Sequence, residues 1–232
     1  TAVLIGEDDQ NSTLIVMEHG GRQIDKIALS NVMVLEYGFF STKGQMLWVM
    51  SLDTEGTVPM SQLTTYRPGR MQSGNITDSD QVLYQVMFDS PSVYTVGTTY
   101  VKTYNYTGVE DTASRKLVYG WYLMDSAGTG SGSLMAYAPM AQVGMQASVS
   151  DVRLICGDID RTVRMPFPCY AVAVHGEKVY GFSEQNVMSI GLKDTKATVT
   201  MLPVVCDNML GITDGREAVM TSGSEVYLVT LP

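Results

Sequence analysis

The chain has 232 residues, of which 45% are hydrophobic and only 17% are charged, values that exclude an intrinsically disordered protein. With 15 basic and 24 acidic side chains, its formal net charge at pH 7 is −9. This balance argues against binding to nucleic acid or to acidic lipid surfaces, because both need a basic face. No run of about 18 apolar residues occurs, so the sequence predicts no membrane-spanning segment.

Short β runs separated by turn residues fill the chain. Turn signals such as Gly157-Asp158, His175-Gly176 and Asp214-Gly215 lie between runs that alternate apolar and polar residues, as in β-hairpins. No segment combines the apolar spacing of an amphipathic helix with a cap and a glycine stop, so helices are not expected. In chain order, the predicted β meanders or hairpins are residues 13–30, 46–69, 82–106, 117–139, 151–168, 170–192 and 204–231.

Two of these segments repeat each other without a gap. VYTVGTTYVKTYNY at 93–106 aligns with VYGFSEQNVMSIGL at 179–192 at an offset of 86 residues. Each contains a strand, a turn and a second strand, and each follows a further strand, within 82–92 and 170–178. The sequence therefore predicts that 82–106 and 170–192 form equivalent antiparallel sheets related by rotation about one central axis.

Repeated meanders of this length are typical of β-propeller blades. We therefore predict an all-β fold, a β-propeller of antiparallel four-stranded blades, with about six blades and a range of five to seven. Residues 1–232 are predicted to form a single domain. The alternative is a β-sandwich or a pair of β domains, neither of which requires a shared hairpin register.

A search for catalytic or metal-binding constellations finds none, so no catalytic residue, metal or cofactor is predicted. His19 and His175 each precede a glycine in a turn, where polar residues are common. The three cysteines, Cys156, Cys169 and Cys206, form no CxxC pair, and we predict buried free thiols and no structural disulfide.

Asp158 and Asp160 are the best candidates for a pair of functional carboxylates. They alternate around Ile159, so both are expected to point to one side of a strand or turn. Paired carboxylates can act as general acid and base in a hydrolase. The competing interpretation is that both are solvated turn residues.

Aromatic side chains give a second set of candidates. Tyr37, Phe39 and Phe40 form a run broken by Gly38, and Trp48 follows in the next β run. Exposed aromatic patches mark recognition sites, so these four residues are the predicted binding residues. The alternative is that they pack between blades.

The segments VYTVGTTYVKTYNYTG (93–108) and VYGFSEQNVMSIGL (179–192) resemble PQQ-like and related bacterial β-propeller repeats. The wider chain, including GQMLWVMSLDTEGTVPMSQLTTYRPG (44–69), resembles an uncharacterised family of propeller-like proteins from Gram-positive gut bacteria. The resemblance implies an extracytoplasmic location at the cell surface and an N-terminal anchor helix before the repeats. The chain lacks the A-x-D-x-x-T-G-x-x-x-W motif of the quinone-dependent dehydrogenases, so the resemblance implies neither quinone binding nor dehydrogenase activity.

These observations favour a non-enzymatic binding or scaffold module displayed outside the cell, whose partner is an unknown protein or glycan. The first alternative is a glycan- or peptide-directed hydrolase that uses Asp158 and Asp160. The second is a structural piece of a larger surface assembly in which an edge strand joins a partner by strand addition.

Overall fold

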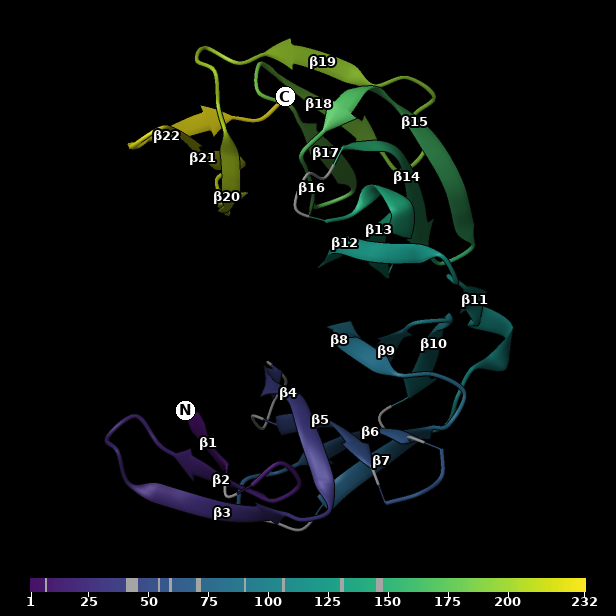
Figure 1. The fold of residues 1–232 in the computed structure, drawn as a ribbon, viewed down its shortest axis with the longest axis vertical. Coiled ribbons are helices and arrows are strands. Elements are labelled where there is room, and N and C mark those ends of the chain that lie inside the picture. Colours follow the sequence, from purple (N-terminus) through teal and green to yellow (C-terminus); the bar gives the residue numbers. More distant parts are fainter. Residues whose placement is uncertain are drawn as a thin grey trace. The chain divides into compact units, whose positions relative to one another are not determined.

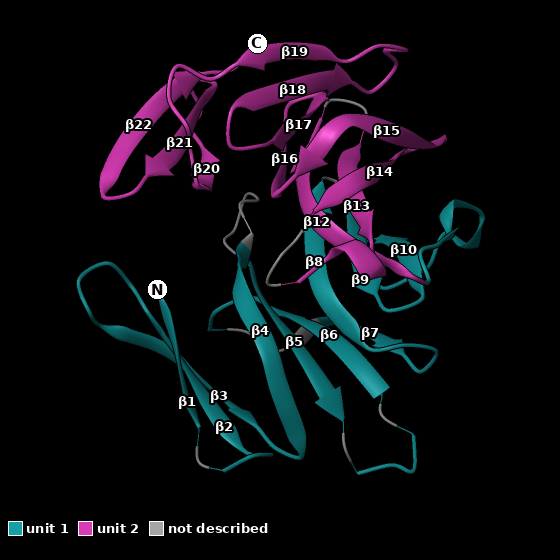
Figure 2. Ribbon diagram, turned by 45° about the horizontal axis from the view of Figure 1, so that its top comes forward, with its two compact units in different colours: residues 1–119 teal, residues 120–232 magenta. Residues whose placement is uncertain are grey.

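The structure is a computed structural model in which the chain divides into two compact units, unit 1 (Thr1–Tyr119) and unit 2 (Gly120–Pro232) (Figure 2). The structure describes all residues except Glu7, 41–45, Thr54, Pro59, 70–71, Ser90, Tyr106, 130–131 and 145–147, and it does not describe the side chains of Phe40, Gln72 and Ser73.

The strands of unit 1 are β1 (Ala2–Gly6), β2 (Ser12–Met17), β3 (Gln23–Leu29), β4 (Val32–Phe40), β5 (Met46–Asp53), β6 (Met60–Tyr66), β7 (Gln72–Asp78), β8 (Leu83–Asp89), β9 (Ser92–Gly97), β10 (Tyr100–Asn105) and β11 (Lys116–Leu117). Within its described residues they form one three-stranded sheet, β1-β2-β3, and two four-stranded sheets, β4-β5-β6-β7 and β11-β10-β9-β8 (Figure 1). A single 3₁₀ turn, Thr112–Ser114, precedes β11.

The strands of unit 2 are β12 (Trp121–Gly128), β13 (Ser133–Pro139), β14 (Val149–Cys156), β15 (Ile159–Cys169), β16 (Ala171–His175), β17 (Lys178–Phe182), β18 (Asn186–Gly191), β19 (Thr198–Met201), β20 (Asn208–Ile212), β21 (Glu217–Ser222) and β22 (Glu225–Thr230). Over its described residues they form the four-stranded sheets β12-β13-β14-β15 and β16-β17-β18-β19 and the three-stranded sheet β20-β21-β22 (Figure 1). A 3₁₀ turn, Met140–Gln142, follows β13.

Within each unit, neighbouring sheets pack face to face over apolar side chains. The sheet β4–β7 buries one face against β1–β3 through Leu14, Val16 and Leu47, and the other against β8–β11 through Trp48 and Val93. In unit 2, the sheet β16–β19 packs in the same way on β12–β15 and on β20–β22. Because alternate residues of a strand point to opposite faces, a sheet in the middle of such a stack needs apolar residues on both faces.

The predicted repeat register is confirmed. Adding 86 to the bounds of β10, Tyr100–Asn105, gives the bounds of β18, Asn186–Gly191. The pairing agrees as well, because Val93 lies opposite Tyr104 in one sheet and Val179 lies opposite Ile190 in the other. The two segments therefore form equivalent antiparallel sheets, one in each unit.

The division of residues 117–139 and 151–168 into two separate repeats is wrong. The strands β12 to β15 belong to one sheet, in which β13 pairs with β14 over Met135–Tyr137. Over the described part of the chain the sheets number six, four of them four-stranded and two three-stranded. The fold is thus all-β and antiparallel, as predicted. A single domain over residues 1–232 stays a prediction.

Candidate functional site

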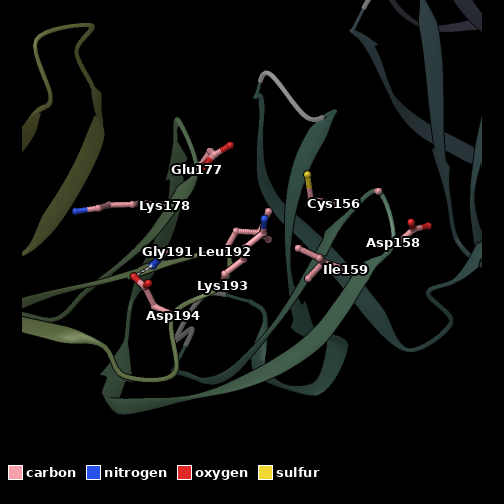
Figure 3. Close-up of a pocket in the computed structure, with 10 residues that line it drawn as sticks. Cys156, Asp158, Ile159, Glu177, Lys178, Gly191, Leu192, Lys193 and Asp194 are labelled. Atoms are coloured by element: carbon pink, nitrogen blue, oxygen red, sulfur yellow. Dashed lines mark hydrogen bonds between the residues drawn. The ribbon is translucent and has the colours of Figure 1, made fainter.

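A groove of about 600 Å³ lies in unit 2, between the sheets β12–β15 and β16–β19. Three turns contribute to it: the β14–β15 turn, the β16–β17 turn and the segment that follows β18. Its lining residues are Cys156, Gly157, Asp158, Ile159, Glu177, Lys178, Gly191, Leu192, Lys193 and Asp194 (Figure 3). In an antiparallel sheet, every second turn lies at the same end of the sheet. Turns that are far apart in the sequence can therefore lie close together at one end of two packed sheets.

Two glycines shape the hairpin turns at this groove. Gly157 has a φ of 54° and Gly176 has a φ of 59°, a left-handed conformation that glycine adopts at no steric cost. The turns are tight, because Cys156 pairs directly with Ile159 and His175 with Lys178. Tight turns on paired strands hold Asp158 and Glu177 at fixed places on the rim.

Arg161 fixes the third turn. Its guanidinium donates to the backbone oxygens of Asp194, at 2.6 Å, and Gly191, at 3.0 Å. Asp194 in turn accepts a hydrogen bond from the backbone N–H of Gly191 through Oδ2, at 2.9 Å (Figure 3). These bonds tie β15 to the end of β18, so this side of the groove is ordered before any ligand arrives.

The rim of the groove carries both signs of charge above an apolar floor. The side chains of Cys156 and Leu192 are buried, and the exposed Lys193 stands beside them (Figure 3). Lys178 lies at the edge of the groove, but its side chain points away from Lys193 and Cys156 and donates from Nζ to the backbone oxygen of Pro232 at 3.1 Å (Figure 3). Such a surface can accept a chain that offers hydrogen-bond donors, acceptors and some apolar area.

The structure brings only one of the two predicted carboxylates to the groove. Asp158 lies in the β14–β15 turn and lines it, whereas Asp160 pairs across the hairpin with Arg153, with two nitrogen–oxygen distances of 2.8 Å. The hydrogen bonds that Arg153 donates to this carboxylate raise the pKa of its guanidinium, which also lies over the ring of Trp121. Asp158 lies in the turn, where strand alternation does not apply, and a joint role of the two carboxylates stays a prediction.

The predicted aromatic residues are distributed between a core and a surface. Trp48 is 9% exposed, packs against Phe88 with ring centroids 5.9 Å apart, and lies over Gly38. Tyr37 is half-buried against the β1–β3 sheet, and its hydroxyl accepts a long hydrogen bond from the backbone N–H of Leu4. For both residues the position fits the alternative interpretation, packing between sheets.

Phe39 is 41% exposed, so a recognition role there stays a prediction. The side chain of Phe40 lies outside the described residues.

Cys156, Cys169 and Cys206 are buried, and none of the three is joined in a disulfide. Burial raises the pKa of the Cys169 thiol to about 12. Among the residues that the structure describes, no three His, Cys, Asp or Glu side chains are grouped as metal ligands would be. Within that same part of the chain, no helix is long and apolar enough to cross a membrane.

Sequence reasoning missed most of the groove. It singled out Asp158 but not Glu177, Lys193 or Asp194, which come from two further turns. One signal was available, since Glu177 follows the His175-Gly176 turn signal and Lys193-Asp194 follows the end of the repeated strand pair. Nothing in the sequence indicated that these turns meet the β14–β15 turn, because that depends on how two sheets pack.

No protein-family model matches this chain, and no curated protein matches it. Solved structures do. The Saccharomyces cerevisiae protein Sqt1 superposes with a TM-score of 0.62 at 10% identity, covering 97% of this chain and 67% of its own. Hsv2 of Kluyveromyces marxianus gives a TM-score of 0.56 at 8% identity, covering 91% of this chain and 66% of its own. Hsv2p of Kluyveromyces lactis gives 0.56 at 8% identity, with coverage of 94% and 67%.

This chain thus spans about two thirds of the length of these proteins. Identities near one residue in ten carry no information on partners or chemistry, and they leave the likeness as one of architecture. The chain has an all-β, β-propeller-like fold.

Proposed function

We propose that this protein is a binding module without catalytic turnover, and that the groove of unit 2 is its binding site. The observation that carries the proposal is the meeting of three fixed turns from two sheets around one groove of about 600 Å³. The partner class is a segment of a protein or a glycan, since both offer the mixed polar and apolar contacts that this rim can make.

Preorganisation supports binding at this place. The bonds from Arg161 to the Gly191–Asp194 turn and the two tight hairpins order the rim in advance, so little entropy is lost when a ligand is bound. A hydrolase with Asp158 and Asp160 as acid and base is less well supported, because Asp160 is committed to Arg153.

The test is a screen of glycan and peptide arrays with the labelled protein, followed by affinity measurements on two variants. Lys193→Ala removes a rim cation, and Lys196→Ala removes an exposed cation in the same turn that does not line the groove. We expect Lys193→Ala to weaken binding to the array hits at least tenfold, about 1.4 kcal/mol, and Lys196→Ala to change it less than twofold.

Three results would contradict the proposal. One is an absence of array binding, and a second is an equal loss for both lysine variants. The third is hydrolysis of a glycan or peptide substrate that Asp158→Asn abolishes.

We also propose that the sheets are the blades of a β-propeller. On this proposal the six sheets correspond to about six blades, which are arranged around one axis. The equal register of β8–β10 and β16–β18 supports it, because equivalent blades repeat one strand pattern. An experimental structure in which the two sheets are not related by rotation about a common axis would contradict it.

Display outside the cell, which the resemblance to extracytoplasmic propeller-like proteins implies, is also proposed. Digestion of intact source cells with an added protease should remove the protein while cytoplasmic markers survive. Survival of the protein together with those markers would overturn this proposal.

A further inference from the structure

Three charged side chains at the groove of unit 2 have no partner within the described part of the chain. Asp158, Glu177 and Lys193 are exposed and line the groove, and their side chains make no hydrogen bond or ion pair with any described residue. The other two charged lining residues are engaged, because Asp194 accepts from a backbone N–H and Lys178 donates to a backbone oxygen. Three charges of the rim are therefore available to a ligand.

These three charges alternate in sign along the rim. In the view of Figure 3, the ammonium group of Lys193 lies between Glu177 on one side and Asp158 on the other. Asp158 belongs to a turn of the sheet β12–β15, whereas Glu177 and Lys193 come from the sheet β16–β19. A ligand that lies along the groove thus meets a carboxylate, an ammonium group and a second carboxylate.

The chemistry of the lining favours a polypeptide over a glycan. None of the ten described residues that line the groove is aromatic, and none is an asparagine or a glutamine. The lining therefore offers no ring to pack on the apolar face of a sugar and no side-chain amide to hold its hydroxyl groups. An acidic glycan would pair with Lys193, but it would also bring its carboxylates toward Asp158 and Glu177, which repulsion disfavours. A polypeptide carries both signs of charge on neighbouring side chains.

We propose that the ligand of this groove is a segment of another polypeptide in which one carboxylate side chain is flanked on both sides by basic side chains. This inference rests on the binding function proposed above. The carboxylate of the segment pairs with Lys193, and its two cations pair with Asp158 and Glu177. The aliphatic stems of the basic side chains then cover the apolar floor around Leu192.

Two general properties fit such a segment. Alternate residues of an extended chain point to the same side, so charges two residues apart can face the rim together. The segment has an excess of positive charge, and the net charge of −9 on this protein attracts it over a distance.

Peptide affinity, measured by fluorescence anisotropy with the unaltered chain, is the first test. The probe carries Lys-Ser-Glu-Ser-Lys within a Gly/Ser-rich peptide, and two comparison peptides carry Glu-Ser-Lys-Ser-Glu or Gln-Ser-Gln-Ser-Gln in the same setting. We expect the probe to bind about tenfold more tightly than either comparison peptide, and its binding to weaken as salt is added. Equal affinities for the three peptides would overturn the proposed charge pattern.

Reversal of single charges on the rim is the second test. Glu177→Lys should weaken binding of the probe about tenfold, because it opposes an ammonium group to a cation of the ligand. Glu184→Lys is the matched control, since Glu184 is exposed in the β17–β18 turn and does not line the groove. Equal losses in these two variants contradict the proposal.

Lys193→Glu should exchange the preference rather than abolish binding. This variant should bind Lys-Ser-Lys-Ser-Lys more tightly than Lys-Ser-Glu-Ser-Lys, which is a gain that a misfolded chain would not show. An unchanged preference for the probe would mean that Lys193 does not meet the carboxylate of the ligand.

A glycan array separates a failure of this inference from a failure of the binding function. If a glycan binds, Lys193→Ala weakens that binding and no charged peptide binds, the polypeptide ligand is overturned while the groove remains the binding site. Binding of neither glycans nor peptides would overturn both.

Discussion

Lys102 on β10 and Met188 on β18 occupy equivalent positions in two sheets of the same register, yet their surroundings are opposite in chemistry. In unit 1, the Lys102 side chain is 4% exposed and donates to Asp78, at 2.9 Å, and Asp80, at 3.2 Å. In unit 2, Met188 is fully buried in an apolar cluster with Met165 and Cys169.

The residues that pair with Lys102 and Met188 on the neighbouring strand also differ between the two sheets. Thr95 pairs with Lys102, whereas Gly181 pairs with Met188. A Cβ on Gly181 would lie 2.4 Å from Cε of Met165 and 2.7 Å from Sγ of Cys169. The glycine thus makes the room that the larger apolar side chains fill.

The comparison shows that two sheets can have the same strand register and turns although the side chains packed against their neighbouring sheets differ. These side chains differ together, as a group of ion-paired residues in unit 1 and a group of apolar residues in unit 2. The ion-paired group requires all of its partners, because the Asp78 side chain is fully buried. Its carboxylate also accepts a hydrogen bond from Nε2 of Gln81 at 2.9 Å. A buried ion pair offsets the desolvation of its charges only when both partners are present. The apolar set instead depends on fit.

The largest effect is expected from Lys102→Met, which places the unit 2 residue into the unit 1 site. It leaves the Asp78 carboxylate buried without its cation, and we expect a loss of about 3–5 kcal/mol in the free energy of unfolding, measured with urea. The double variant Lys102→Met, Asp78→Leu should recover most of that loss, since it removes both charges. A single variant as stable as the unaltered chain would show that the ion pair does not hold this contact.

Overfilling the unit 2 site is expected to cost less. Gly181→Ala places a methyl group against Met165 and Cys169 and should lower the free energy of unfolding by about 1–3 kcal/mol. Gly211→Ala is the matched control, because a Cβ at Gly211 on β20 meets no atom within 4 Å. Equal effects for the two variants would contradict the role assigned to Gly181.

Asp125 joins the same two sheets of unit 2 by a polar contact, accepting the backbone N–H of Val174 at 2.7 Å and that of Ser126 at 2.8 Å. Burial raises the pKa of this carboxyl above its ordinary value of 3.8, although both hydrogen bonds lower it in part. The folded protein therefore holds this proton more tightly than the unfolded chain does. Its contribution to stability is present below pH 3.8 and is lost as the pH rises through the folded-state pKa.

Asp125→Asn should remove that contribution, so the difference in unfolding free energy between the variant and the unaltered chain should change between pH 3 and pH 6. The shift should favour the variant at the higher pH. Asp158→Asn, which changes an exposed turn carboxylate, should show a smaller shift. Identical pH profiles for the two variants would contradict the assignment to Asp125.

The smallest effect concerns reactivity rather than stability. Because Cys169 is fully buried and its pKa is raised to about 12, the native protein should react with a thiol reagent at pH 8 far more slowly than the unfolded chain. Unfolding without a reductant should release all three thiols. Gly181→Ala, by loosening the contact, should speed the labelling of Cys169. A count of one thiol would mean that two of the cysteines are joined.

The amino-acid sequence by itself determined the class of fold and the strand register. Alternation of apolar residues and glycine turns predicted antiparallel sheets, and the offset of 86 residues placed β10 and β18 at equivalent positions. These features depend on neighbours along the chain and across a hairpin, which is why a single sequence reveals them. The grouping of β12–β15 into one sheet was missed because the pairing of β13 with β14 crosses the long connection 140–148.

The packing of one sheet on the next was decided only in the tertiary structure. Alternation cannot say whether a face meets solvent or another sheet, so Trp48 was predicted on a surface and lies in a core, and the partners of Lys102 were not predicted at all. The groove has the same origin, since Asp158, Glu177 and Lys193 are brought together by two sheets that pack face to face. Contacts between sheets depend on the shapes of both surfaces at once, and that information is not local in the sequence.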